Sequence, residues 1–392
     1  MSHRRWLIET LALLSLLAAR VAAQEPAPPA AVREFPRLDA HLAITGQQAP
    51  GQLQTAVWVH PEYGVLSTII TVDPVGNRLV VYDLGGNVID THTIEAPGGL
   101  DVRYDFPLGG ATPDIVVVNQ RQEPGRLLVY RIDPEKRTLV RVDNEKIVTG
   151  VGNQCALYRS PKTDKFYVFV SSEGGTIAQF DLRDDGTGKV GGTGQAVATR
   201  QVPGPADALC ADDERGRLLV AERARGVWQC GAEPDESAPG ALLIKVGEND
   251  LNPEIDGLAL YRLRRGRGYV LVASRAGDTV GVYERGTCKY LGSFQIERGQ
   301  GLRGLAACGA DLGLNRRQGL VLTTAQRAPG RRDLLGLTWE NIAAACRLPP
   351  LARGAAWEPR QKDLVAPDPE KPEKPGPLEK PEKPKPRPPV VH

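Results

Sequence analysis

The feature that most constrains the fold is a pattern that recurs six times along the chain. Each copy has an apolar segment, a short polar turn and a second apolar segment that ends in an aromatic residue. These aromatic residues follow one another at intervals of 48 to 56 residues, at Tyr82, Tyr130, Phe180, Trp228, Tyr283 and Trp339. A repeat of about 50 residues that is built from short strands is typical of the blades of a β-propeller.

A further short apolar segment precedes each of the six strand pairs. These segments are Ala56–Val59, Gly99–Tyr104, Ala156–Arg159, Ala208–Asp212, Gly257–Tyr261 and Gly304–Cys308. Three strands joined by tight turns form the inner part of a propeller blade. We therefore predict an all-β chain folded as a six-bladed β-propeller. Another all-β barrel is the alternative, because strands alone do not fix how a sheet closes. A helical repeat would need apolar residues every three or four positions, which occur only near residues 340–346.

The first 23 residues have the three parts of an export signal. A basic start at residues 3–5 precedes a short apolar stretch at residues 11–19, and small residues follow before Gln24. Nine apolar residues are too few to cross the hydrocarbon core of a bilayer, which is about 30 Å thick. We therefore predict a signal peptide at residues 1–23, and an exported protein that is periplasmic or extracellular.

Composition divides the rest of the chain into three parts. Residues 24–38 are rich in Pro and Ala and form a predicted lead-in segment. In residues 366–392, Pro alternates with Lys and Glu, so this part cannot bury a core and is predicted to be a disordered tail. The propeller is therefore predicted over residues 39–365.

The balance of positive and negative charges bears on which partners the protein can bind. The chain has 49 Lys and Arg against 47 Asp and Glu, a formal charge of +2. This balance gives no global reason to expect a nucleic-acid partner. No long apolar run beyond the N-terminus predicts a membrane span. We expect a monomer.

The cysteines predict cross-links. There are six of them, and an even number in an exported chain indicates three disulfides, with fifteen pairings possible. No C-x-x-C spacing occurs, and the predicted propeller contains only His41, His60 and His92 as imidazoles. A zinc site of Cys and His is therefore not expected.

A series of short motifs resembles the β-propeller phytases. The sequence DVRYDFPL at residues 101–108 is similar to a stretch in the second blade of that family. Further similar motifs are ADDE at 211–214, AEPD at 232–235, IDGL at 255–258, VYER at 282–285 and WENI at 339–342. Together the similar segments run in the family's order from about residue 58 to residue 342.

The resemblance implies calcium-dependent hydrolysis of phytate, which is inositol hexakisphosphate, by a phosphomonoester hydrolase of the 3-phytase type. In that family, calcium ions in an acidic channel hold the substrate phosphates, and a calcium-bound water attacks phosphorus. Hard cations favour carboxylate oxygens and lower the pKa of bound water, which suits this chemistry. The implied cofactor is calcium, and the implied ligand is a phosphorylated inositol or another polyanion.

The resemblance also assigns roles to single residues. Asp207 and Asp256 stand where the family has Glu and are the predicted catalytic carboxylates. Arg121 and Arg103 are predicted to bind substrate phosphate, since guanidinium groups can hold phosphate through two parallel hydrogen bonds. The predicted metal ligands are Asp101, Asp212 and Glu222. Each of these residues also has a structural interpretation, as a turn residue or as one partner of an ion pair.

Several positions depart from the family's pattern. Residues 53–56 read LQTA where the family has two carboxylates, and Arg223 and Arg303 stand where the family is acidic. Calcium affinity follows the number and charge of the ligands, so these changes weaken the case for a calcium site. They support a second hypothesis, a catalytically inactive exported propeller that binds a ligand or a protein. A third hypothesis is a hydrolase that uses another metal. The sequence lacks the histidine cluster that would support this hypothesis.

Overall fold

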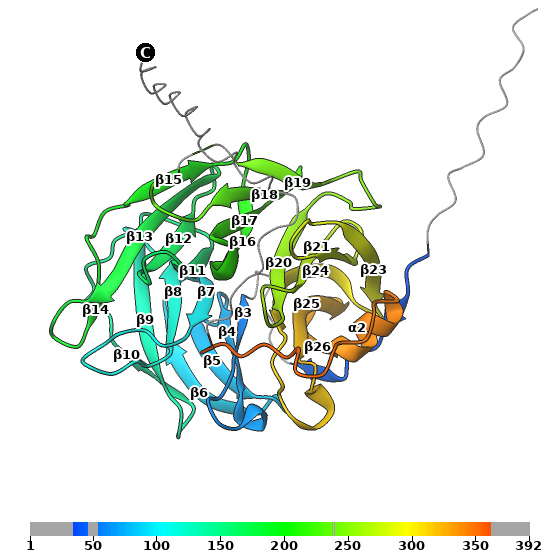
Figure 1. The fold of residues 1–392 in the computed structure, drawn as a ribbon, viewed down its shortest axis with the longest axis horizontal. Coiled ribbons are helices and arrows are strands. Elements are labelled where there is room, and N and C mark those ends of the chain that lie inside the picture. Colours follow the sequence, from blue (N-terminus) through cyan, green and yellow to red (C-terminus); the bar gives the residue numbers. More distant parts are fainter. Residues whose placement is uncertain (1–33, 46–53, 237, 239, 362–392) are drawn as a thin grey trace, which may run out of the picture. The chain divides into compact units, whose positions relative to one another are not determined.

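The chain forms six β-sheets arranged as blades around a central channel, as Figure 1 shows. This is a computed structural model, and it describes residues 34–45, 54–236, 238 and 240–361. The predicted six-bladed β-propeller is confirmed. The signal peptide at residues 1–23, most of the lead-in segment and the tail at residues 366–392 lie outside the described residues.

Each of the first four blades is a run of consecutive antiparallel strands. The first has β3 (Thr55–Trp58), β4 (Thr68–Asp73), β5 (Arg78–Asp83) and β6 (Val88–Thr93), and the second has β7 (Pro97–Arg103), β8 (Ile115–Gln120), β9 (Arg126–Asp133) and β10 (Thr138–Arg141). The third has β11 (Cys155–Arg159), β12 (Phe166–Ser171), β13 (Thr176–Asp184), β14 (Val190–Gly191) and β15 (Ala198–Gln201). The fourth has β16 (Ala206–Asp212), β17 (Arg217–Glu222), β18 (Gly226–Gly231) and β19 (Ala241–Lys245).

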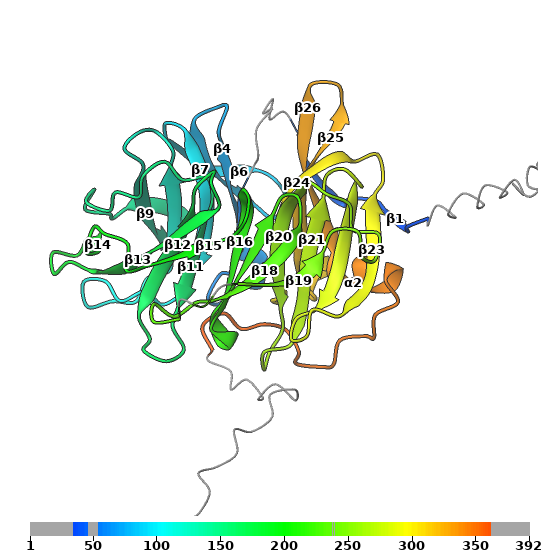
Figure 2. The same ribbon diagram turned by 90° about the horizontal axis from the view of Figure 1, so that it is seen from above.

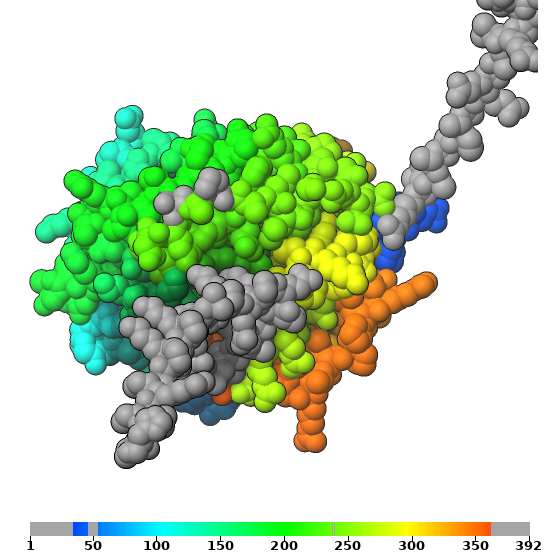
Figure 3. Space-filling model, turned by 45° about the horizontal axis from the view of Figure 1, so that its top comes forward, coloured from blue at the N-terminus to red at the C-terminus, as the bar shows by residue number. Residues whose placement is uncertain are grey.

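The fifth and sixth blades each include a strand from the N-terminal side of the propeller, which gives the fifth sheet five strands and the sixth sheet four. The fifth has β20 (Ile255–Arg262), β21 (Gly268–Ser274), β22 (Thr279–Glu284) and β23 (Tyr290–Ile296), and the sixth has β24 (Gln300–Cys308), β25 (Leu320–Ala328) and β26 (Arg331–Thr338). The helix α2 (Trp339–Ala345) follows β26. The β25–β26 hairpin projects from the sixth blade in the turned view of Figure 2, and Figure 3 shows the outer surfaces of the third to fifth blades as one continuous face.

Pairing between the two ends of the sequence closes the ring. Strand β2 (Leu42–Ile44) pairs antiparallel with β26 and completes the sixth sheet, with Leu42 opposite Gly336. Strand β1 (Arg37–Leu38) pairs in parallel with β23. The propeller therefore starts two residues before residue 39. A two-residue strand has no period that a sequence could reveal, and it is defined only by the sheet edge that it joins.

The repeat predicted from the sequence matches the blades. The six predicted inner segments coincide with β3, β7, β11, β16, β20 and β24, which line the channel. Tyr82, Tyr130, Phe180 and Tyr283 are buried in the third strand of their blades. Trp339 differs, because it is the first residue of α2 and not the end of a strand. Its ring is buried and stacks on Tyr261 with 3.7 Å between ring centroids.

The segment after α2 covers the channel at the end where the inner strands finish. The Trp357 ring lies against the Tyr104 ring, 5.7 Å between centroids, and the Arg262 guanidinium lies 5.3 Å from the centre of the Trp357 ring. Arg360 pairs with Asp114 and donates a hydrogen bond of 2.9 Å to the Val59 carbonyl oxygen. These contacts place a wide aromatic side chain beside the ends of the inner strands.

The disulfide prediction is wrong, because all six cysteines are free thiols in the structure. Four of them, Cys155, Cys210, Cys230 and Cys308, lie in strands of the third, fourth and sixth blades. These four cysteines act as small packing residues. Burial raises the pKa of the thiols of Cys308 and of Cys346 to about 11. An even count of cysteines could not reveal that the fold holds them apart.

The helices among the described residues are all too short or too polar to cross a membrane.

Candidate functional site

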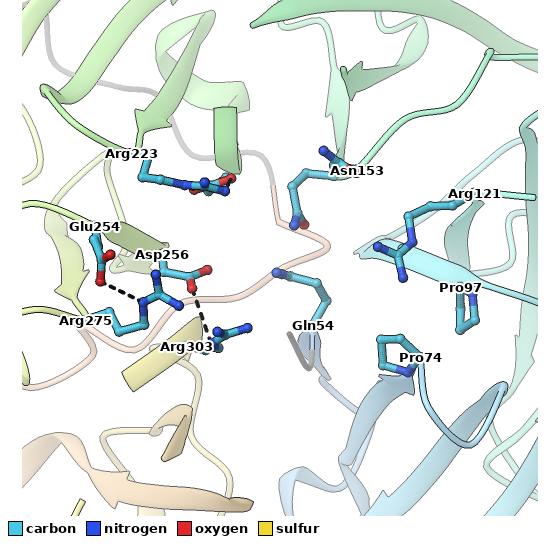
Figure 4. A pocket seen from close by; sticks show the side chains of 13 residues that line it. Gln54, Pro74, Pro97, Arg121, Asn153, Arg223, Glu254, Asp256, Arg275 and Arg303 are labelled. Atoms are coloured by element: carbon cyan, nitrogen blue, oxygen red, sulfur yellow. Dashed lines mark hydrogen bonds and ion pairs between the residues drawn. The ribbon is translucent and has the colours of Figure 1, made fainter. Parts of the chain in front are cut away.

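A cavity of about 310 Å³ opens at the end of the channel where the inner strands begin. We call it the mouth cavity, and Figure 4 shows the side chains around it. It is lined by Gln54, Pro74, Pro97, Gly98, Arg121, Asn153, Gln154, Asp207, Arg223, Glu254, Asp256, Arg275 and Arg303. All six blades contribute to this lining, because each innermost strand starts at this end. Its volume is at the lower end of the usual range for small-molecule sites, roughly 300–1,000 Å³.

Two β-bulges aim carboxylates into the mouth cavity. The pairing of β16 with β17 shifts register between Ala206 and Ala208, and the pairing of β20 with β21 shifts between Ile255 and Gly257. The residues at the two bulges are Asp207 and Asp256. A bulge bends the strand and redirects the extra side chain. These neighbouring blades therefore present their carboxylates at equivalent places.

Three arginines occupy another equivalent position. Arg121, Arg223 and Arg275 are each the first residue after the second strand of a blade, following β8, β17 and β21. The backbone N–H group of each arginine donates a hydrogen bond to the carbonyl oxygen of the residue just before the inner strand of its blade. The N···O distances are 2.8, 3.2 and 3.0 Å for Arg121, Arg223 and Arg275. The shared backbone geometry explains why all three side chains reach the mouth cavity. Arg303 joins them from the inner strand β24.

Each carboxylate of the mouth cavity faces a guanidinium. Asp207 accepts two hydrogen bonds from Arg223, 2.5 Å from Nε and 3.0 Å from Nη2. Arg275 lies 3.0 Å from Glu254, and Arg303 lies 3.7 Å from Asp256. The hydrogen bond with Asp207 raises the pKa of Arg223.

Arg121 differs from the other arginines of the mouth cavity. Among the residues that the structure describes, no carboxylate forms an ion pair with its guanidinium, which points into the cavity in Figure 4. Gly98 leaves room for it, since a Cβ atom there would lie 3.1 Å from Arg121 Cγ and 2.8 Å from the Asn153 carbonyl oxygen. With four arginines and three carboxylates, the lining carries a formal charge of +1.

The structure brings together three of the residues predicted from the sequence. Arg121, Asp207 and Asp256 all line the mouth cavity. Arg103 does not line it: its buried guanidinium, at the end of β7, bonds Asp101 at 2.9 Å and Asp213 at 3.0 Å. Arg103 therefore joins the second and fourth blades, and its structural interpretation fits the geometry better than phosphate binding.

The three predicted metal ligands do not meet. Asp101 lies within β7, where it also accepts a hydrogen bond of 2.9 Å from the Leu157 N–H. Asp212 pairs with Arg217 at one end of β17, and Glu222 is the last residue at the other end. At about 3.4 Å per residue, five steps along a strand separate these two residues by about 17 Å. One calcium ion cannot bind both.

The donors of the mouth cavity do not fit calcium either. Among the described parts of the chain, no group of three or more His, Cys, Asp or Glu side chains could hold a metal ion. Calcium takes six to eight oxygen ligands, and in the mouth cavity each of the three carboxylates already lies beside a fixed positive charge. A divalent cation would have to displace these guanidinium groups.

Sequence reasoning missed Glu254 as part of the site. It identified Arg223 and Arg303 as departures from a family pattern, with Arg275 nearby, and it allowed such arginines to bind polyanions directly. Their common location follows from the blade register. The signal that could have identified them was the repeat itself. Aligning the six copies at the end of the second strand places Arg121, Arg223 and Arg275 in one column.

Comparisons with known proteins agree with the motifs. The family model described as Phytase matches residues 6–323. A 3-phytase from Bacillus subtilis (strain 168) is 33% identical over 255 residues, which cover 64% of this chain and 66% of that protein. The match thus spans slightly less than two thirds of this relative's length.

Two solved structures are similar at low sequence identity. Regucalcin from Agrobacterium tumefaciens, a calcium-binding protein, is 12% identical with a TM-score of 0.46, over 77% of this chain and 94% of that one. A luciferin-regenerating enzyme is 13% identical with a TM-score of 0.46, over 76% and 95%. At these TM-scores neither likeness bears on function.

Proposed function

Because this chain belongs to the Phytase family, we propose that it is a phytase-like phosphomonoester hydrolase that releases phosphate from phytate in the mouth cavity. The observation that carries the proposal is the convergence of four arginines and two bulged aspartates on one cavity. Guanidinium groups match phosphate oxygens in geometry and charge. The two aspartates were the catalytic residues predicted from the sequence.

The chemistry that we propose is attack of water on phosphorus. A new P–O bond forms from the water oxygen, the ester P–O bond breaks, and the leaving inositol oxygen receives, through an aspartate, the proton that the water loses. Asp207 and Asp256 are the candidate acceptors for the proton that the water loses. The arginines would hold the phosphate and stabilise the charge on its outer oxygens in the transition state.

Calcium is the cofactor that the family implies, and phytases of this fold are generally calcium-dependent. We assign it no step here, because the donors that line the mouth cavity are paired with arginine. The same pairing favours a second candidate function, a propeller that binds phosphorylated ligands without turning them over. Export through residues 1–23 is also proposed, and an N-terminus at Gln24 on the secreted protein would support it.

The test is phosphate release from phytate by the purified protein, in millimolar calcium and again in a chelator. We expect Arg121→Ala to lower the rate by at least about tenfold, since a hydrogen bond to a charged group contributes about 1.5–3 kcal/mol. Arg225→Ala is the matched control, because Arg225 lies two residues after Arg223 and is absent from the cavity lining. No phosphate release under either condition would contradict hydrolysis and leave the binding function.

A further inference from the structure

We infer that the mouth cavity binds a ligand with several phosphate groups through direct arginine contacts that need no calcium bridge. The inference rests on the proposed function for the kind of ligand, a polyphosphorylated small molecule. It differs from what the family implies, because there calcium ions stand between protein carboxylates and phosphate. In this chain each carboxylate of the mouth cavity lies beside a guanidinium group instead.

The arginines retain hydrogen-bond donors after pairing with the carboxylates. A guanidinium has five N–H groups, and Arg223 uses one on Nε and one on Nη2 to bind Asp207. Three donors of Arg223 therefore remain, and 52% of its side chain is exposed. The carboxylate holds the guanidinium in place, so less side-chain entropy is lost when a phosphate binds.

Arg303 supplies a second, independent observation. Its Nε atom is buried and has no hydrogen-bond partner among the described residues, since Asp256 at 3.7 Å is beyond hydrogen-bond distance. A buried donor without a partner is costly. A phosphate oxygen in the mouth cavity, or a shift of Asp256 on binding, would satisfy this donor.

The net charge of the lining favours an anion over a cation. Four arginines exceed three carboxylates by one, and within the part of the chain that the structure describes Arg121 has no carboxylate partner. A phosphate monoester carries a charge of about −1.5 to −2 at neutral pH. Such a group next to Arg121 neutralises the excess charge, whereas a calcium ion would add two positive charges to it.

The arrangement indicates more than one phosphate. Figure 4 shows Arg121 across the mouth cavity from Arg223, Arg275 and Arg303. The four side chains come from the second, fourth, fifth and sixth blades. A single phosphate cannot contact all of them. A compact ring that carries phosphates around its edge can contact both sides.

Titration calorimetry on the full chain in excess chelator tests the inference. The probes are phytate, myo-inositol hexakissulfate as a polyanion without phosphorus, and inorganic phosphate. We expect both hexa-anions to bind in chelator, and inorganic phosphate to bind at least about a hundredfold more weakly. Arg121→Ala should weaken hexa-anion binding by about ten- to a hundredfold, while the control Arg225→Ala changes it less than threefold.

A double variant of the Arg223–Asp207 pair guards against loss of folding. Arg223→Ala alone would leave Asp207 without its partner, so we pair Arg223→Gln with Asp207→Asn, which removes both charges together. This double variant should keep the wild-type Tm within a few degrees and weaken hexa-anion binding at least about tenfold. Calcium alone should not shift the Tm of the wild-type protein.

The outcomes separate this inference from the proposed hydrolysis. Hexa-anion binding in chelator without phosphate release would support the inference and contradict hydrolysis. Phosphate release that needs calcium, with no binding in chelator, would overturn the inference and keep hydrolysis. Equal effects of Arg121→Ala and Arg225→Ala on binding would also overturn it, because the contacts would then be only a general surface attraction.

Discussion

Replacing Asp212 with Asn is expected to destabilise the propeller strongly. Asp212 pairs with Arg285, and both side chains are fully buried at 0% exposure. Arg217 lies 3.2 Å away through its Nε, and Arg285 also contacts Glu214 at 3.1 Å. Because Asp212 and Arg217 belong to the fourth blade while Arg285 follows β22 of the fifth, this cluster holds two neighbouring blades together.

The magnitude follows from this burial. Removing one partner of a buried ion pair costs about 3–5 kcal/mol, because the remaining charge has lost both water and its counterion. Asn keeps the shape of Asp and can still accept a hydrogen bond, so we expect about 3 kcal/mol. At an unfolding entropy of about 2.1 cal/mol/K per residue, a propeller of about 320 residues shifts its Tm by about 1.5 °C per kcal/mol, so the Tm should fall by roughly 4–5 °C.

Urea unfolding of the two proteins measures this difference. The matched control is Asp164→Asn, where the ion pair with Arg159 has a short contact of 2.7 Å but Asp164 is exposed. An exposed pair contributes at most about 1 kcal/mol. If Asp212→Asn costs no more than Asp164→Asn, the reasoning from burial is refuted. If the loss appears only when calcium is present, Asp212 is the metal ligand that the family resemblance suggested.

The same cluster predicts a pH dependence. Burial alone would raise the pKa of Asp212, but attraction and hydrogen bonding from Arg285 and attraction from Arg217 outweigh it and lower the pKa. The unfolded chain has an ordinary Asp pKa of about 3.9. The contribution of Asp212 is thus complete above about pH 4 and is lost as pH falls toward the folded pKa. The stability gap between wild type and Asp212→Asn should therefore narrow below about pH 4.

Two further predictions concern thiols and backbone. The unfolded protein should react with six equivalents of a thiol reagent without prior reduction, and a reducing agent should not change the Tm. No reactive thiol before reduction would restore the prediction of three disulfides. Gly319→Ala should cost well over the roughly 1–2 kcal/mol of a left-handed backbone, because its Cβ would lie 1.8 Å from the Cys308 carbonyl oxygen. Gly330→Ala is the control, with a similar positive φ and no atom near its Cβ, and equal losses would contradict the steric argument.

The architecture was predictable because it is local and repeated. A strand, a turn and a strand that recur every 50 residues or so can be recognised without knowing their neighbours, and all six inner strands lie where the sequence predicted. Ring closure was not predictable in the same way. The short strands β1 and β2 are defined by the edges of β23 and β26, which lie more than 250 residues away along the chain.

The candidate site was predictable in part. The resemblance identified Arg121, Asp207 and Asp256, which do share the mouth cavity. It also identified Asp101, Asp212 and Glu222, which lie at different levels of the sheets. A motif specifies which residue types occur along a strand, while the register between strands decides the end of the propeller at which each side chain lies.

By itself the sequence determined the fold class, the number of blades and the family, since each depends on patterns that neighbouring residues carry. Only the tertiary structure decided which charges meet. Arg223 and Asp207 lie 16 positions apart, and Arg303 and Asp256 lie 47 apart. Their contacts turn an expected acidic channel into a cavity lined by ion pairs. The energy of a charge depends on distance and burial, and these exist only once the six blades have closed around the channel.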